Sequence, residues 1–262
     1  MHRKKNFMIL RNIKLKSTIV NISRNVSIDF DKFGSLLCVG AIGTGKTYLL
    51  SFIVGSLYLN LNKDVEFYSI DPKGLELTSL MRYVGGTTAH SGKEIFTVLR
   101  SVRDEMMERY HLLSKKSIKD GFSCDFPPLF LVIDELIFIK NIVSEGHKTV
   151  QERNKAFRDV LDLLSQIAVL GRQCRVFCFI ASQYLNTDYL PLSISENLLN
   201  RIFLGNPTSR DIIQVFGESF DVSSFEGYGL YKNPSLQEPK IFIPYQYDMR
   251  QMIEQIELEN NK

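Results

Sequence analysis

Residues 40 to 47 read GAIGTGKT, which fits the pattern G-x-x-x-x-G-K-[ST]. The stretch follows the apolar run SLLCV at 35–39 and opens the helical run TYLLSFIVGSLYL at 47–59. A glycine-rich loop between a strand and a helix can point backbone N–H groups at a phosphate, and the helix N-terminus adds partial positive charge. Because a strand and a helix flank the pattern, we favour a phosphate-binding loop over a glycine-rich turn that merely shares its letters.

The chemistry of such a loop gives its residues separate tasks. Lys46 can reach the β- and γ-phosphates of ATP, and the Thr47 hydroxyl is suited to ligate Mg²⁺. ATP and Mg²⁺ are therefore the expected cofactors. The loop residues expected to bind the nucleotide are Gly40, Ala41, Ile42, Gly43, Thr44, Gly45, Lys46, Thr47 and Tyr48.

Two adjacent carboxylates end a second apolar run. In LFLVIDEL, Asp134 and Glu135 follow a stretch that reads as a buried strand. Asp134 can hold the Mg²⁺ shell, whereas Glu135 is placed to orient and deprotonate a water that attacks the γ-phosphate. The alternative is that the pair caps a following helix. Together the two motifs predict an ATPase core, with Lys46 and Glu135 among its catalytic residues.

Short apolar runs alternate with longer segments of helical spacing. The runs are rich in β-branched and aromatic residues and read as buried strands at 35–39, 65–70, 129–133, 176–181 and 201–205. The segments 91–115 and 150–170 repeat apolar residues every three or four positions, as amphipathic helices do. This order predicts an α/β fold with a mainly parallel β-sheet flanked by helices.

The composition suits one globular domain with small appendages. The 262 residues are 44% hydrophobic and 23% charged, with a net charge of +3. No run reaches the roughly 20 apolar residues that span a bilayer, and no signal peptide opens the chain, so we expect a cytoplasmic protein. Residues 1–16 contain six Lys or Arg and no acidic residue, which could meet phosphate, an anionic membrane surface or only solvent.

Further stretches, taken in order, resemble a known family. SIDPKGLEL at 69–77, EMMERY at 105–110 and VLGRQCRVFCFIASQ at 169–183 surround the two nucleotide motifs, and NRIFLG, TSRDIIQVFGESF and GYGLY follow them. In this order they resemble the motor domain of the FtsK/SpoIIIE family of DNA translocases, within the wider class that includes HerA ATPases and conjugative coupling proteins. The resemblance implies a RecA-like P-loop NTPase that acts as a hexameric ring.

The resemblance also assigns regions and roles. It implies an ATPase motor domain at 31–246; the charge of the sequence marks a basic N-terminal segment at 1–30, and apolar residues at helical spacing mark a C-terminal amphipathic helix at 247–262. Gln183 would sense the γ-phosphate or hold the attacking water. Arg172 would reach into the neighbouring subunit's site as an arginine finger, and Arg210 would lie near the nucleotide. The alternatives are a surface salt bridge for Arg172 and a helix-starting charge for Arg210.

The sequence departs from the family where the family contacts DNA. An arginine and a proline are expected after the sensor glutamine, but Gln183 is followed by Tyr184, Leu185 and Asn186, and 187–200 contains no Lys or Arg. Duplex binding depends on neutralising phosphates, whereas aromatic side chains suit unstacked bases. We therefore expect DNA contacts that favour a single strand over a duplex, from Tyr184, Asn186 and Tyr189.

A small motor of this kind resembles those of plasmids, integrative conjugative elements and phages. We expect an ATP-hydrolysing DNA translocase or coupling protein that forms a homo-oligomeric ring. A relaxase, a replication initiator or a membrane component of a transfer apparatus would be its partner and could recruit it to the membrane. Two alternatives remain: an FtsK-like ATPase that engages a protein substrate in secretion, and a regulatory ATPase that does not translocate anything.

Overall fold

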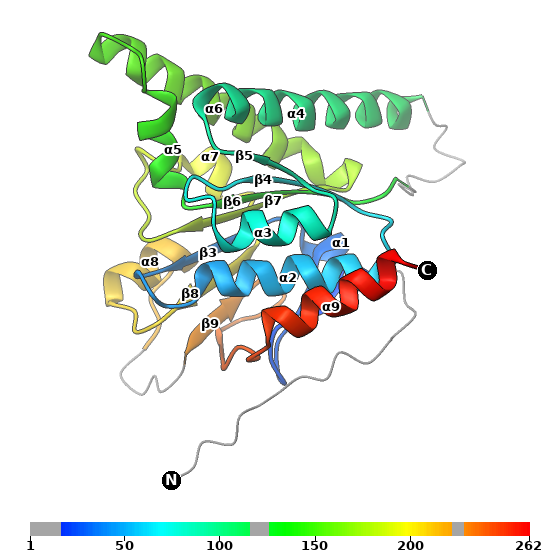
Figure 1. The fold of residues 1–262 in the computed structure, drawn as a ribbon. Helices are drawn as coiled ribbons and strands as arrows, with labels where there is room; N and C mark the ends of the chain where they lie inside the picture. The colour runs from blue at the N-terminus through cyan, green and yellow to red at the C-terminus, as the bar shows by residue number, and fades with distance from the viewer. Residues whose placement is uncertain (1–16, 116–125, 222–227) are drawn as a thin grey trace.

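The computed structural model describes residues 17–115, 126–221 and 228–262 (Figure 1). Within them, an eight-stranded sheet forms the centre of the molecule. In spatial order its strands are β10 (Lys240–Phe242), β9 (Gly229–Lys232), β8 (Asn200–Leu204), β3 (Leu36–Gly40), β7 (Val176–Ser182), β6 (Leu129–Asp134), β4 (Glu66–Ile70) and β5 (Thr87–Ala89). Neighbours from β8 to β5 pair in parallel, and β9 and β10 are antiparallel. The predicted α/β fold is confirmed.

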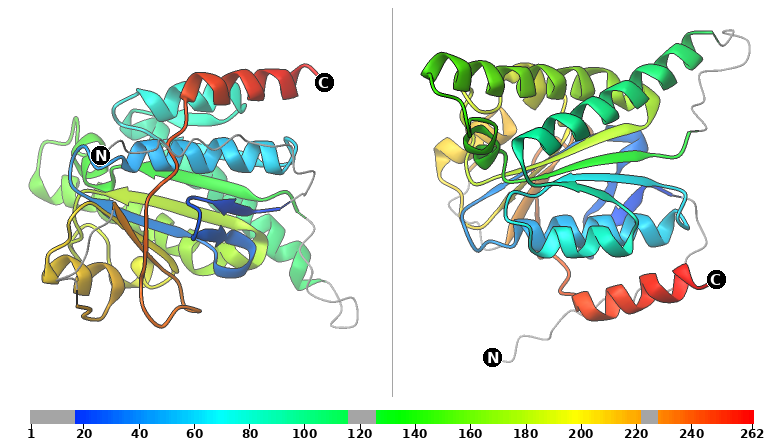
Figure 2. Two further views of the ribbon diagram at one scale, coloured as in Figure 1. Left: turned by 90° about the horizontal axis from the view of Figure 1, so that it is seen from below. Right: turned by 45° about the horizontal axis from the view of Figure 1, so that its top comes forward.

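Helices cover both faces of the sheet, as Figure 2 shows from two further directions. One face carries α2 (Lys46–Asn60), α3 (Glu76–Tyr83) and α9 (Met249–Asn260). The other carries α4 (Gly92–Ser114), α5 (Leu136–Val143), α6 (Val150–Leu170), α7 (Leu192–Ser195) and α8 (Ser209–Phe216). In the described part of the chain, none of these helices combines the length and apolarity needed to cross a membrane.

The central strands are buried on both sides because alternate residues face different helical layers. In β6, Leu131 and Ile133 pack in the cluster with α4 and α6, whereas Phe130 and Val132 pack in the cluster with α2 and α3. Such strands read as continuous apolar runs, which is why each was predicted to within about one residue of its observed bounds. The short edge strands β5 and β10, three residues each, were too short for that pattern to reveal.

Residues before the expected boundary at 30–31 pack against the same sheet as the residues that follow it. The strands β1 (Ile19–Asn21) and β2 (Ser27–Asp29) form an antiparallel hairpin that leads into the short helix α1 (Phe30–Phe33). The hairpin buries Val20 and Ile28, and α1 buries Phe30, in the same core as α2. Three-residue strands carry too little alternation to be recognised in sequence. Residues 1–16, the basic part of the expected segment, lie outside the described residues.

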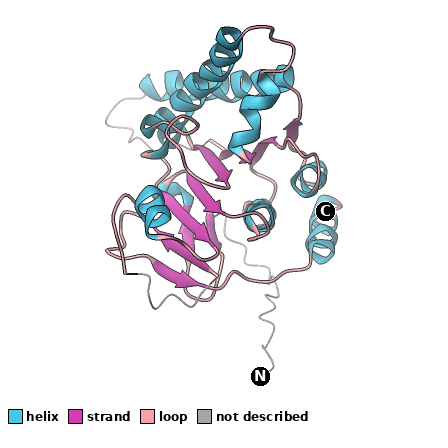
Figure 3. Ribbon diagram, turned by 90° about the vertical axis from the view of Figure 1, so that its left-hand side faces the viewer, coloured by secondary structure: helices cyan, strands magenta, loops and turns pink. Residues whose placement is uncertain are grey.

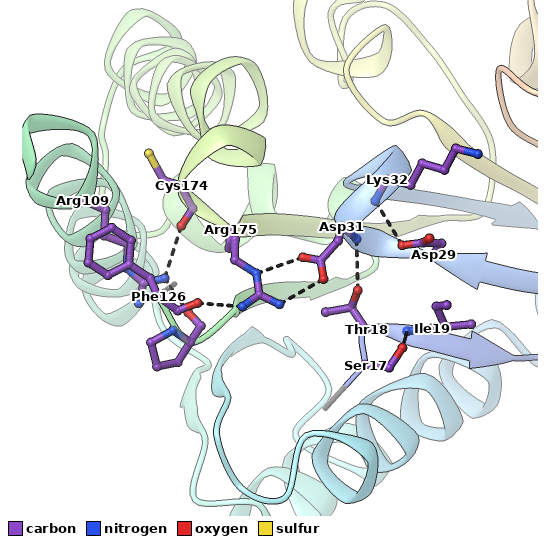
Figure 4. A network of polar contacts seen from close by, with 11 residues as sticks. Ser17, Thr18, Ile19, Asp29, Asp31, Lys32, Arg109, Phe126, Cys174 and Arg175 are labelled. Carbon is purple, nitrogen blue, oxygen red and sulfur yellow. Dashed lines mark hydrogen bonds and ion pairs between the residues drawn. The ribbon is translucent and has the colours of Figure 1, made fainter. Parts of the chain in front are cut away.

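Arg109 and Arg175 form hydrogen bonds between distant segments near the amino ends of β6 and β7 (Figure 4). The Arg175 guanidinium donates to both carboxylate oxygens of Asp31, at 2.9 and 3.0 Å, and to the Phe126 carbonyl oxygen at 2.9 Å. Arg109 of α4 is only 2% exposed. It donates to Glu105 at 2.7 Å, to Glu66 at 2.9 Å and to the Pro127 carbonyl oxygen at 2.6 Å. Arg109 thereby joins α4 to β4 and β6.

Replacing Arg109 by methionine should destabilise the fold. The substitution keeps most of the apolar stem but leaves the Pro127 carbonyl and two carboxylates without their donor, so we expect a loss of about 2 to 3 kcal/mol. Urea unfolding followed by circular dichroism would measure it. Arg100→Met on the exposed side of α4 is the matched control and should change stability by less than about 0.5 kcal/mol. Equal stabilities for the two variants would contradict the role given to Arg109.

Candidate nucleotide site

The loop between β3 and α2 has a backbone that depends on its glycines. Gly43 and Gly45 have φ values of 79° and 91°, in the left-handed region that favours glycine. Gly45 is the N-cap of α2, so the loop runs directly into a helix N-terminus. A Cβ at Gly40 would overlap the carbonyl oxygen of Leu204 in the adjacent strand β8. The loop can therefore wrap around a phosphate with its N–H groups at a positive helix end.

Lys46, the first residue of α2, is 8% exposed. Its ammonium donates to the carbonyl oxygens of Gly40 at 2.6 Å and Ala41 at 3.0 Å, so it lies inside the loop. Burial lowers the pKa of Lys46, and the nearby charges of Glu135 and Asp134 oppose that shift. A phosphate in the loop would supply the full negative charge that the two carbonyls lack.

Thr47 and Asp134 lie in direct contact although 87 residues separate them. The Thr47 hydroxyl is 3.0 and 2.9 Å from the two carboxylate oxygens of Asp134, which is 3% exposed. Burial raises the pKa of Asp134, and the hydrogen bond from Thr47 opposes that shift. A hydroxyl and a carboxylate are ligands that Mg²⁺ prefers, and a cation here would offset the cost of burying the carboxylate. The residues therefore fit Mg²⁺ beside the phosphate loop.

Glu135 has an unusual backbone. Its φ and ψ are both 80°, a left-handed conformation that costs a non-glycine residue about 1 to 3 kcal/mol, and it is 1% exposed. One carboxylate oxygen accepts the backbone N–H of Gln183 at 3.2 Å. Glu135 precedes α5 but makes no capping hydrogen bond with its side chain. The carboxylate is thus held between the ends of β6 and β7 instead of serving the helix.

These side chains meet because the parallel strands end at one edge of the sheet, which faces the viewer in Figure 3. The carboxyl ends of β3, β7 and β6 are neighbours there. Lys46 and Thr47 follow β3, Gln183 follows β7, and the two carboxylates end β6. The structure thus brings together the catalytic and metal-binding residues expected from the two motifs, together with Gln183.

Tyr48 belongs to the same turn of α2, but its side chain contacts the C-terminal segment. Its hydroxyl hydrogen-bonds the backbone carbonyl and N–H of Tyr247, and the two rings lie 4.1 Å apart between centroids. The Tyr247 hydroxyl donates to the Tyr48 carbonyl oxygen at 3.1 Å. Tyr48 would therefore contact a nucleotide through its backbone, because its side chain is engaged with Tyr247. Tyr247 could not be predicted as a neighbour of this turn, because no local pattern pairs residues 199 positions apart.

The two other arginines of interest lie in different places. Arg172 is exposed in the 3₁₀ turn Gly171–Cys174 that precedes β7, at the edge of the sheet opposite the nucleotide loop. Arg210 is exposed in the first turn of α8, beyond the carboxyl end of β8 and thus on the nucleotide side. Arg172 therefore lies away from the nucleotide loop of its own chain, whereas Arg210 lies on the same side of the sheet as that loop.

The residues expected to contact DNA differ in exposure. Tyr184 is 51% exposed. Asn186 shapes a turn, since its side-chain oxygen accepts the Asp188 N–H at 2.9 Å and its carbonyl accepts the Tyr189 N–H at 3.0 Å. Tyr189 is half-buried and packs edge-on against Phe157, with 6.1 Å between ring centroids. Tyr184 is therefore the open ring of this loop, whereas Tyr189 is anchored against α6.

Comparison with known proteins agrees with this geometry. The model of the FtsK/SpoIIIE family matches residues 11–170. The FtsK domain-containing protein YdcQ of Bacillus subtilis is 26% identical over 219 residues, covering 82% of this chain and 43% of that protein. The DNA translocase SftA of the same organism is 26% identical over 216 residues, covering 76% of this chain and 21% of that protein. This chain thus spans less than half the length of either relative.

A solved structure shows the same fold. The conjugation coupling protein TcpA of pCW3, in its monomer form with ATPγS, has a TM-score of 0.80 and 21% sequence identity. The similarity covers 100% of this chain and 75% of that one. Because the family model spans more than half of the sequence and its nucleotide motifs meet at one edge of the sheet, the chain belongs to the FtsK/SpoIIIE family of P-loop ATPases.

Proposed function

We propose that the chain is an ATP-hydrolysing DNA motor or coupling protein. The observation that carries this proposal is the arrangement at the carboxyl edge of the sheet. A buried lysine in the phosphate loop, a hydroxyl–carboxylate pair and a second buried carboxylate converge there from β3 and β6. Membership of a family whose relatives include a DNA translocase supports DNA as the substrate.

Each residue of the site has a task in hydrolysis. Lys46 stabilises negative charge on the β- and γ-phosphates, and the loop N–H groups orient them. Thr47 and Asp134 hold Mg²⁺, which when bound offsets charge on the phosphates. Glu135 accepts the proton of the attacking water, and its rigid backbone fixes the direction of that carboxylate. Gln183, whose N–H bonds to Glu135, is placed to hold the water or to sense the γ-phosphate.

A ring would complete this site. Arg172 lies at the edge opposite the phosphate loop, so its guanidinium can meet a γ-phosphate only if it comes from another copy of the chain. Arg210, on the nucleotide side, would bind phosphate within its own subunit. We therefore propose a homo-oligomeric ring, a hexamer by family resemblance, in which each interface holds one ATP.

The DNA in our proposal is single-stranded, and the setting is a plasmid, an integrative conjugative element or a phage. The exposed ring of Tyr184 and the lack of Lys and Arg at 187–200 support a single strand. The similarity to a conjugation coupling protein supports the setting. A relaxase, a replication initiator or a membrane component of a transfer apparatus would deliver the cargo. Such a partner would bring a cytoplasmic ring to the membrane.

A hollow on the face of the sheet that carries α7 and α8 favours a second candidate function, the engagement of a protein substrate. It has a volume of about 560 Å³ and lies between the loop after β7, α8 and the end of β9. Its apolar lining includes Leu185, Leu192 and Ile213. Side chains of this kind suit an apolar peptide segment better than a phosphate backbone. The half-buried Arg201 beside it already donates to three backbone carbonyls.

Glu135→Gln should separate ATP binding from hydrolysis. The amide keeps the shape of the side chain but cannot accept a proton, so we expect ATP affinity to persist while turnover falls by about 10²- to 10⁴-fold. Binding of a fluorescent ATP analogue and release of phosphate would measure the two steps. Glu108→Gln, on the exposed side of α4, is the control. Turnover within twofold of the unaltered chain would remove Glu135 from the mechanism.

Mixing two inactive variants should restore turnover if the ring exists. Arg172→Ala should bind ATP yet lose about 10³-fold or more in turnover, and Lys46→Ala should lose the phosphate contact itself. In a mixed ring, some interfaces combine an intact Arg172 with an intact Lys46. We therefore expect phosphate release to reappear on mixing and to peak at intermediate ratios. Absence of any recovery, with mixed assembly verified by size-exclusion chromatography, would argue against a finger acting between subunits.

The form of DNA that stimulates turnover tests the proposed substrate. Oligo(dT) should stimulate ATP hydrolysis more than a duplex of equal length, because stacking on an aromatic ring needs unpaired bases. Phosphate release at matched nucleotide concentration and fixed salt gives the comparison. Equal or stronger stimulation by the duplex would reject the single-strand preference. Turnover without DNA, together with no retention of either form at low salt, would favour the protein-substrate or regulatory alternative.

A further inference from the structure

Helix α5 lies between the loops that follow β4 and β7. It begins directly after Glu135, so its start is fixed to the proposed catalytic carboxylate. The ammonium of Lys73, in the loop after β4, lies 5.7 Å from the ring centroid of Phe138. The ammonium of Lys140 lies 5.0 Å from the ring centroid of Tyr189, in the loop after β7. Both contacts pair a cation with an aromatic face, and α5 takes part in each.

Lys140 is held in place without an opposite charge. Its ammonium also lies 5.8 Å from the ring centroid of Phe157, so two aromatic rings flank it. The ion pairs among the described residues involve other side chains, and none of them places a carboxylate within 4.0 Å of Lys140. The aromatic faces attract the cation but do not neutralise it. Lys140 therefore presents a positioned positive charge at this edge, and no carboxylate of the described residues forms an ion pair with it.

The ammonium of Lys140 lies beside the loop after β7, whose own sequence has no positively charged residue. Residues 184–200 contain no Lys or Arg, whereas Asp188 and Glu196 carry negative charge. The turn at Asn186 fixes Tyr189 against α6, and that ring in turn holds Lys140. Residues 184–200 thus have no cation of their own, but Lys140 of α5 places one beside them. Tyr184, five positions before Tyr189 in the same loop, stays open to solvent.

We infer that Lys140, seated on Tyr189, binds a phosphate of a single DNA strand whose neighbouring base stacks on Tyr184. The inference rests on the proposed function and names how this loop would grip its substrate. An ammonium is a compact donor that bonds one phosphate without a fixed geometry, which suits a flexible strand. One such charge per subunit is too few to bind a duplex, whose affinity depends on many phosphate contacts. Lys140 is also connected to Glu135 by the backbone of α5, which begins directly after Glu135.

The salt dependence of DNA binding tests this role. Fluorescence anisotropy of a labelled oligo(dT), measured with full-length chain and ATPγS over a series of salt concentrations, gives the slope of log K against log salt. Lys140→Gln should weaken binding and reduce the magnitude of the slope by about 0.7 for each Lys140 that contacts a phosphate. Lys140→Arg should keep both. ATP turnover in the absence of DNA should be the same for all three chains.

Two further variants separate this contact from general electrostatics. Lys63→Gln removes an exposed charge from the turn after α2, at the opposite edge of the sheet, and should leave the slope unchanged. Tyr189→Leu should weaken oligo(dT) binding as Lys140→Gln does, without adding to it in the double variant, whereas Tyr189→Phe should bind normally. These results would support the inference.

Three results would overturn it. An unchanged slope for Lys140→Gln, with normal binding by the unaltered chain, rejects the Lys140 contact and leaves the DNA motor standing. An equal loss in Lys63→Gln shows a diffuse charge effect in place of a site. Failure of the unaltered chain to bind either oligo(dT) or duplex at low salt rejects the DNA motor, and the contact with it.

Discussion

The hydrogen bonds from Thr47 to Asp134 connect two strands that are not neighbours. β3 and β6 are separated in the sheet by β7, so the contact spans the end of the strand between them. In this structure β7 lies between the two, parallel to both, and all three strands end at the same edge of the sheet. The contact between the two motifs thus depends on both the order and the parallel direction of these strands. In this order the Thr47 hydroxyl meets the buried Asp134 carboxylate, which would otherwise lose a hydrogen-bond partner.

Glu135 adds a second constraint at the same edge. Its left-handed backbone turns the chain sharply from β6 into α5, and the amide of Gln183 holds the carboxylate against β7. A relaxed backbone would aim the side chain elsewhere, so the surrounding packing must maintain the strain. The conformation of Glu135 thus sets the direction of the candidate base, the start of α5 and the contact with Gln183. Geometry of this kind is typical of sites where position matters more than stability.

The sequence predicted the parts of the molecule whose cause is local. Buried parallel strands are apolar runs, the phosphate loop has an obligatory glycine pattern, and both long helices have clear periodicity; all are found close to their predicted bounds. The β1–β2 hairpin escaped because three-residue strands carry little pattern. Contacts between distant segments were not predicted, for a different reason. Neither the Tyr48–Tyr247 pair nor the seat of Lys140 on Tyr189 has any local signature, since both arise only when the sheet brings separate loops together.

Tyr247 joins the C-terminal segment to the turn that would hold the phosphates. Four contacts run along α2: Tyr48 with Tyr247, Phe52 with Tyr247, Gly55 beside Met252, and Tyr58 with Asn260. The first turn of α2 is therefore shared by the phosphate loop and the anchorage of α9. If a ligand that orders this turn thereby strengthens the packing of α9, thermodynamic reciprocity requires that loss of this packing weakens ligand binding to the same extent. The C-terminal segment and the phosphate loop thus pack on the same turn of α2, so a partner or a force that displaced this segment would act on the turn that would hold the phosphates.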